Sequence, residues 1–266
     1  MSPPLPAFLL LISIAFTSAS AVPLQPGFYT ETCPEAEFIV KDVMRRNMIR
    51  EPRSAASVMR FQFHDCFVNS GGPDWEVKLG REDSLTASQE DANNIMPSPR
   101  ANASLLMDLF ERYNLSVKDM VALSGSHSIG QARCFSIVFR LYNQSGSGKP
   151  DPTIEQRYRE KLNRLCPLGG DENVTGDLDA TPTMFDNRYF KDLVAGRGFL
   201  NSDQTLYTFP ETRKYVALFS QDQRTFFNAF VEGMIKMGDL QSGRPGEIRS
   251  NCRMVNSRPV NALLES

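Results

Sequence analysis

The 266-residue chain lacks the charge that nucleic-acid-binding proteins usually carry. Its formal net charge is -2, and the sequence contains no basic block. An extended phosphate-binding surface is therefore not expected. Internal repeats and low-complexity tracts are also missing. Because 41% of the residues are hydrophobic and 23% are charged, the chain can bury a sizeable core. We expect one large domain or two closely packed ones.

Hydrophobic runs of membrane length are absent as well. The apolar stretch at residues 7–16 is too short to span a bilayer, and the small residues 17–21 follow it. This order is typical of a secretory signal, although no Lys or Arg precedes the apolar stretch. We predict that residues 1–21 form a cleaved signal peptide. Residues 22–266 would then be an exported protein without membrane contact.

Cysteine is present in an odd number. The five cysteines are Cys33, Cys66, Cys134, Cys166 and Cys252. In an oxidising compartment, an odd number leaves at least one cysteine without a partner in its own chain. Four Asn-x-Ser/Thr sequons, at Asn102, Asn114, Asn143 and Asn173, agree with a glycosylated exported protein.

Apolar residues recur at helical spacing along most of the chain, which predicts a mostly α-helical fold. The predicted helices cover residues 35–49, 54–68, 103–113, 132–142, 154–165, 185–196 and 225–237. Ser116 and Asp119 form a capping box that predicts a further short helix, ending at Ser124-Gly125. Residues 75–80 alternate like a short extended segment.

Histidine occurs only twice, and each copy lies in a compact motif. His64 follows Arg60 by four residues, so the two side chains share one face if the segment is helical. The pair could take a proton from a small substrate and stabilise the negative charge that develops. The alternative is a buried helix with one hydrogen-bonded histidine.

Three kinds of site could use the two histidines. A zinc site would need short His/Cys spacings that the sequence lacks. A hydrolase could use the serines around His127, but no Gly-x-Ser-x-Gly elbow is present. The third possibility places the histidines on opposite sides of a haem. One would ligate the iron, and the other would act on a bound small oxidant.

The motifs around these histidines resemble those of the secretory plant peroxidases, the class III haem peroxidases. The matching segments are Phe28-Tyr29-x-x-x-Cys33-Pro34, Arg60-Phe61-x-Phe63-His64-Asp65-Cys66-Phe67-Val68, Leu123-Ser124-Gly125-x-His127-Ser128-Ile129-Gly130 with Cys134, Thr181-Pro182-x-x-Phe185-Asp186-Asn187-x-Tyr189, and Ser202-Asp203-Gln204. The resemblance covers nearly all of the chain after the signal. It implies a mostly α-helical haem peroxidase fold, with haem b between a distal half (residues 22–119) and a proximal half (residues 120–266).

The implied function is the reduction of hydrogen peroxide with oxidation of small phenolic donors. The resemblance further implies a monomer secreted to the extracellular space, cell wall or vacuole. On the distal side, His64 would be the base that moves the peroxide proton, and Arg60 would stabilise the developing charge. Phe63 would pack over the haem face, and Arg53 and Ser57 would meet the haem propionates.

On the proximal side, the resemblance makes His127 the ligand of the haem iron. Asp203 would accept the other ring N–H of His127 and make the imidazole more basic. Pro97 would line the edge where phenolic donors approach, and Cys134 would form a disulfide with Cys166.

A proximal calcium site is implied as well, with oxygen ligands of the kind that this cation prefers. Its ligands would be Ser128, Asp179, Thr181, the Met184 carbonyl and Asp186. Asp177 competes with Asp179 for one position, because the local spacing varies within the family.

The chain departs from the family pattern after Asn69. Family members continue with a further loop, whereas Asn69 here runs directly into a Ser-Gly-Gly-Pro turn. Roughly sixty residues are missing by comparison, which is closer to several helices than to a loop variation. Of a distal calcium site, only Asp65 and the Val68 carbonyl would remain.

By the family pattern, the missing segment also holds the disulfide partners of Cys33, Cys66 and Cys252. Losing a native disulfide from a secreted domain costs about 2–5 kcal/mol. The alternative hypothesis is therefore a catalytically impaired or inactive splice or gene-model variant of such a peroxidase.

Overall fold

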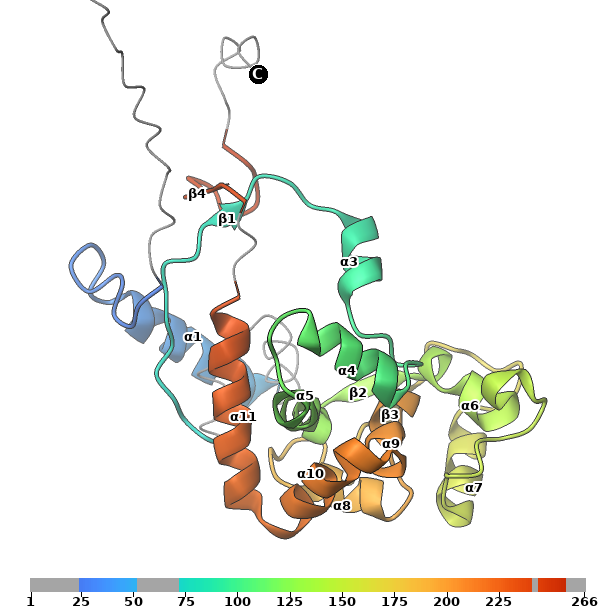
Figure 1. Cartoon of the computed structure of the whole chain (residues 1–266). Coiled ribbons are helices and arrows are strands. Elements are labelled where there is room, and N and C mark those ends of the chain that lie inside the picture. The colour runs from blue at the N-terminus through green and yellow to red at the C-terminus, as the bar shows by residue number, and fades with distance from the viewer. Residues whose placement is uncertain (1–23, 52–71, 241–243, 257–266) are drawn as a thin grey trace, which may run out of the picture.

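The protein is seen in a computed structural model that describes residues 24–51, 72–240 and 244–256. The predictions for the signal peptide and for a helix at residues 54–68 lie outside these ranges. The described chain is mostly helical, as the apolar periodicity predicts (Figure 1). Its α-helices are α1 (Ala36–Arg50), α3 (Gln89–Ile95), α4 (Ala103–Glu111), α5 (Val117–Ser124), α6 (Val138–Tyr142), α7 (Gln156–Leu165), α8 (Arg188–Val194), α9 (Asn201–Thr208), α10 (Pro210–Gln221) and α11 (Gln223–Gly238).

Short elements connect the helices. The 3-10 helices are η2 (Gly125–Ser128), η3 (Cys134–Ser136) and η4 (Gln144–Gly146). The strands β1 (Asp83–Ser84) and β4 (Gly246–Glu247) pair antiparallel, as do β2 (Gln131–Arg133) and β3 (Thr175–Asp177). The predicted extended segment at residues 75–80 makes a single bridge, from Leu79 to Gln25, instead of a strand.

The main core surrounds α5, which is packed among α4, α10 and α11 (Figure 1). Met120, Val121 and Ala122 of α5 are fully buried there. An aromatic cluster completes this core; it consists of Phe185, Phe190, Phe219, Phe226 and Phe230. Because α5 leads directly into His127, this core fixes the position of the candidate site.

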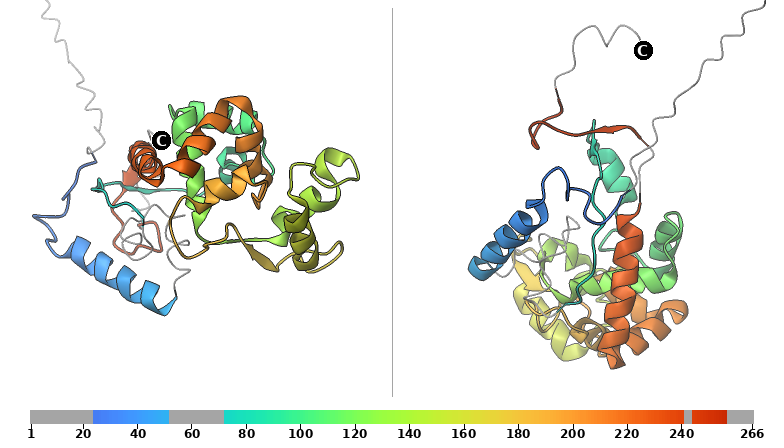
Figure 2. Two further views of the ribbon diagram at one scale, coloured as in Figure 1. Left: turned by 90° about the horizontal axis from the view of Figure 1, so that it is seen from below. Right: turned by 90° about the vertical axis from the view of Figure 1, so that its left-hand side faces the viewer.

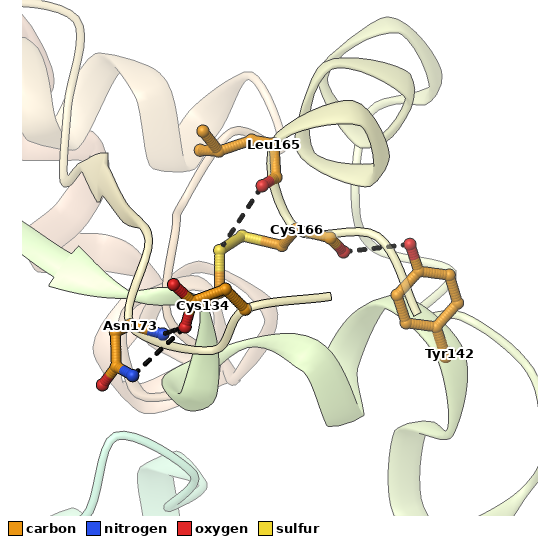
Figure 3. The surroundings of a disulfide bond; sticks show 6 residues. Cys134, Tyr142, Leu165, Cys166 and Asn173 are labelled. Carbon is orange, nitrogen blue, oxygen red and sulfur yellow. Dashed lines mark hydrogen bonds between the residues drawn. A yellow bond between two sulfur atoms is a disulfide. The ribbon is translucent and has the colours of Figure 1, made fainter. Parts of the chain in front are cut away.

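A second, smaller core lies around α6 and α7. Cys134 and Cys166 are joined there by the disulfide that the resemblance implies (Figure 3). The Tyr142 hydroxyl donates to the Cys166 carbonyl at 3.0 Å. Arg140 is fully buried and pairs with Asp151, with 2.7 Å between Nε and Oδ2. The disulfide and the ion pair tie the α6–α7 region together.

The predicted helix at residues 132–142 is partly wrong. Its first residues form β2, because their backbone pairs with β3, and only residues 138–142 are α-helical. Cys134 N–H also donates to the Val174 carbonyl at 2.8 Å. Tertiary pairing here overrides the local helical pattern.

Two other helices begin later than predicted. The Glu155 side chain accepts from the backbone N–H groups of Arg157 and Tyr158, so α7 starts at Gln156. In the segment 185–196, Asp186 Oδ1 accepts from Arg188 N, and α8 starts at Arg188. Both starts follow a carboxylate that satisfies the first backbone donors.

Helix α1 forms where the apolar stripe predicts it. Among the described residues it buries only Met48, whereas Phe38 is 71% exposed and Ile39 is 51% exposed. Figure 2 shows α1 at the side of the helical body. The helix was therefore predictable, although the described residues do not cover its apolar face.

Candidate functional site

The helix α5 places His127 at the edge of the main core. Its start is the predicted capping box, in which Ser116 Oγ accepts from Asp119 N and Asp119 Oδ2 accepts from Ser116 N. Lys236 of α11 adds an ion pair to the buried Asp119 at 2.8 Å. The chain then tightens into η2, which carries His127.

His127 is bound to a buried carboxylate. Its Nδ1 lies 2.8 Å from Asp203 Oδ1, and Asp203 is 1% exposed. A carboxylate at this distance accepts the Nδ1–H, which fixes the tautomer and puts the ring lone pair on Nε2, the nitrogen that could hold a metal. The His127 side chain is 37% exposed. A fixed, partly exposed imidazole backed by a carboxylate is the usual arrangement of a metal-ligating histidine.

Helix α9 holds Asp203 in place. Its carboxylate Oδ2 accepts from the backbone N–H of Leu200 at 3.2 Å, which caps the start of α9. The helix itself was not predicted, because its sequence has no marked apolar stripe. Asp203 was found through its family motif alone, since 76 residues separate it from His127.

Tyr189 is a third member of this site, and sequence reasoning assigned it no role. Its hydroxyl donates to Asp203 Oδ1 at 3.1 Å, and its ring lies edge-on to His127, with 6.2 Å between ring centroids. Burial raises the pKa of Tyr189 well above its ordinary value, and the Asp203 carboxylate raises it further. The hydroxyl therefore stays protonated and acts as a donor.

An oxygen-rich cluster begins one residue after His127. Ser128 Oγ lies 3.3 Å from Asp179 Oδ2, 3.2 Å from the Met184 carbonyl and 3.0 Å from the Asp186 carbonyl. Thr181 Oγ1 lies 3.2 Å from Asp186 Oδ1. One hydroxyl proton cannot serve so many acceptors at once. Converging oxygens of this kind suit a hard cation.

The buried negative charge of the cluster is consistent with a site for a cation. The pKa of Asp179 is raised to about 7, chiefly by burial and also by the charges of Asp186 and Asp192. The hydrogen bond from Thr181 N lowers this pKa, but not enough to offset them. No group of three or more His, Cys, Asp or Glu side chains converges within the described ranges. The cluster instead combines two carboxylates with hydroxyl and carbonyl oxygens, which calcium accepts.

The structure distinguishes the two aspartates that sequence spacing left open. Asp179 is buried and faces Ser128, whereas Asp177 is exposed and accepts from Gln131 Nε2 at 2.7 Å. Met184 has an exposed side chain and turns its carbonyl toward Ser128. Within the predicted set, Asp179 belongs to the oxygen cluster and Asp177 does not.

The remaining predicted residues are only partly placed. Pro97 is exposed in the stretch after α3, and α9 holds the following residues through a hydrogen bond from Ser202 N to the Pro99 carbonyl. Cys33 and Cys252 are free and exposed. The predicted distal residues lie outside the described part of the chain; they are Arg53, Ser57, Arg60, Phe63, His64, Asp65, Cys66 and Val68.

Among the described residues, the helices are all too short or too polar to cross a bilayer. The family model described as Peroxidase matches residues 67–222. Peroxidase 17 of Arabidopsis thaliana is 58% identical over an alignment that covers 98% of this chain and 99% of the relative. Peroxidase C2 of Armoracia rusticana is 35% identical, with 94% of this chain and 92% of the relative covered.

The alignment with Peroxidase 17 spans 326 positions, yet 98% of 266 residues is only about 261. About 65 positions of that alignment therefore have no residue of this chain. This number is close to the roughly sixty residues by which the family pattern exceeds this chain. The family model and these relatives identify the chain as a member of the class III plant haem peroxidase family.

Proposed function

We propose that the chain is a secreted haem peroxidase that reduces hydrogen peroxide and oxidises small phenolic donors. The observation that carries this proposal is the 2.8 Å contact between His127 Nδ1 and the buried Asp203. A carboxylate behind an imidazole increases the basicity of the ring, which favours oxidised iron. The sequence left two other site types open, a zinc site and a hydrolase site, and the family assignment supports the haem site.

The residues around His127 fit a haem. His127 would hold the iron through Nε2, since Nδ1–H donates its hydrogen bond to Asp203. A bound haem would supply the iron that passes electrons from the donor to the peroxide. Asp203 keeps the proton of His127 on Nδ1 by accepting it in a hydrogen bond. The Tyr189 hydroxyl and the backbone N–H of Leu200 donate to Asp203 and fix its position.

On the other side of the pocket, the sequence motif assigns the proton transfer. His64 would take a proton from one peroxide oxygen and return it to the oxygen that leaves as water. Arg60 would stabilise the negative charge during this transfer. Phe63 would cover the haem face, and Arg53 and Ser57 would bind the propionates. Two donor molecules would each lose one electron and one proton, which balances the formation of two water molecules.

The oxygen cluster beside His127 would bind calcium. We assign the ligands to Ser128, Asp179, Thr181, the Met184 carbonyl and Asp186. A cation would neutralise the buried Asp179 carboxylate and would brace the residue next to His127. Any distal calcium site would have only Asp65 and the Val68 carbonyl.

The remaining parts of the proposal concern processing and substrate access. Residues 1–21 would be removed as a signal peptide, and residues 22–266 would act as a glycosylated monomer in the cell wall, the extracellular space or the vacuole. Pro97 would line the edge where phenolic donors approach.

Expression of residues 22–266 with haem and calcium tests the proposed function. We expect peroxide-dependent oxidation of guaiacol, lost in His64→Ala and retained in Asp108→Asn, a change at an exposed position of α4. A haem-loaded protein without this oxidation would contradict the proposal and would support an impaired variant instead.

A further inference from the structure

Asp203 Oδ1 is shared by two donors. His127 Nδ1 lies 2.8 Å from this oxygen, and the Tyr189 hydroxyl lies 3.1 Å from it. The other carboxylate oxygen, Oδ2, accepts from Leu200 N. The backbone donor thus uses one oxygen, while the histidine and the tyrosine compete for the charge of the other.

We propose that Tyr189 is a positioning residue that sets how strongly Asp203 acts on His127. Each donor at a common oxygen draws negative charge toward itself, so the Tyr189 hydroxyl weakens the hydrogen bond that His127 donates to Asp203. The effect is large for a charged acceptor in a dry site, because hydrogen bonds to ionised groups are about twice as strong as neutral ones. Asp203 and Tyr189 are each 1% exposed, so water does not screen the interaction of the Tyr189 hydroxyl with the carboxylate.

The Tyr189 ring adds a steric constraint. It lies edge-on to the imidazole at an interplanar angle of 76°, and it also packs edge-on against Phe190. Because Phe190 is fully buried in the main core, the ring cannot move without disturbing that packing. Tyr189 therefore fixes the plane of His127 with its ring and the strength of the hydrogen bond with its hydroxyl.

A purely structural role makes a different prediction. A buried tyrosine hydroxyl needs a partner, and Asp203 could simply supply one. In that case, Tyr189→Phe would lower the melting temperature without changing the electronic state of His127. The experiment must therefore read the His127 hydrogen bond itself.

The test uses Tyr189→Phe, which keeps the ring and removes only the hydroxyl. The chain has two histidines, so selective ¹⁵N labelling of histidine in residues 22–266 gives two ring systems, which His64→Gln assigns. We expect the His127 Nδ1–H proton to move downfield in Tyr189→Phe, because its hydrogen bond strengthens. The matched control is Tyr142→Phe, whose hydroxyl bonds to the Cys166 carbonyl in the second core. It should leave this proton unmoved.

A His127 proton that shifts no more in Tyr189→Phe than in Tyr142→Phe would overturn the proposal. If Tyr189→Phe fails to fold, 3-fluorotyrosine introduced at position 189 keeps the hydroxyl and makes it a stronger donor. The proton should then move upfield, and a downfield shift or no shift would overturn the proposal equally.

The consequence for haem rests on the proposed function. In the haem-loaded protein, Tyr189→Phe should lower the ferric/ferrous reduction potential, Asp203→Asn should raise it, and Tyr142→Phe should leave it unchanged. An unchanged potential in Tyr189→Phe would contradict the proposal in the loaded protein. If no variant binds haem, the proposed function fails, whereas the proton shift still decides the role of Tyr189.

Discussion

The Ser128 hydroxyl lies 3.0 Å from the backbone oxygen of Asp186 and accepts from Asp186 N at 3.1 Å. Ser128 directly follows His127, and Asp186 precedes α8, which carries Tyr189. The oxygen cluster therefore connects the histidine to the helix that helps to hold its carboxylate partner. A cation in the cluster would stabilise both segments at once.

Calcium should raise the melting temperature of the protein. A ligand at one hundred times its Kd adds about 2.7 kcal/mol to the free energy of unfolding. Thermal unfolding with calcium chloride and with EGTA measures the difference. Ser128→Ala should lose most of it, while Asp177→Asn, outside the cluster, should keep it. A wild-type protein that melts at the same temperature in both buffers would contradict the assignment.

Gly125→Ala should destabilise the aromatic core against which the segment carrying His127 packs. A Cβ at Gly125 would lie 2.5 Å from Phe226 Cε2 and 3.0 Å from Phe190 Cζ, so the aromatic core would have to shift. Overpacking of this kind costs about 1–3 kcal/mol. Gly238→Ala is the matched control, because a Cβ there would meet nothing within 4 Å. Urea unfolding compares them, and equal stability of the two variants would refute the prediction.

The structure also shows which features the sequence could predict. The capping box of Ser116 and Asp119 was predictable, because its hydrogen bonds join residues three apart. The strand β2 was not, because its three residues are extended only through pairing with β3, about forty residues later. Spacing alone could not choose between Asp177 and Asp179, since the choice depends on which carboxylate turns inward.

For the site, family motifs brought His127 and Asp203 together where local patterns could not. Tyr189 was part of a motif, yet its role depends on the direction of one hydroxyl. That direction follows from the packing of α8 against α9 and α10. A linear pattern carries no such information.

The buried Arg140–Asp151 pair should make stability fall in acid. Burial raises the pKa of Asp151, but the Thr153 hydrogen bonds and the Arg140 charge outweigh it, and the net pKa lies below the ordinary 3.8. A carboxylate with a lowered folded pKa stabilises the protein above its unfolded pKa. This stabilisation is lost as the pH falls below 3.8 through the folded value.

Asp151→Asn tests this directly. It should lower the free energy of unfolding at pH 7 by about 3–5 kcal/mol, because Arg140 keeps a buried charge without a counter-ion. Between pH 5 and 3, the variant should lose less stability than the wild type. Urea unfolding at both pH values measures this, with Asp108→Asn as the surface control. Parallel losses in Asp151→Asn and wild type would show that the pair does not govern acid stability.

Asp203→Asn should impair the haem site more than the fold. Asn keeps the size of the side chain but removes the charge that orients and polarises His127. Partners of metal-ligating histidines typically contribute about 10–100-fold in affinity or activity. Haem affinity and guaiacol turnover should therefore each fall by about 10–100-fold. The melting temperature of the haem-free protein should change little. Full turnover in Asp203→Asn would contradict this role.

The most direct measurement of the central claim is a haem titration of residues 22–266, followed by the Soret band. The account predicts saturable binding to the wild type at one haem per chain. It also predicts that His127→Gly loses this spectrum and that added imidazole restores it. A His127→Gly variant with an unchanged Soret band, or a folded wild-type protein that binds no haem, would contradict the account.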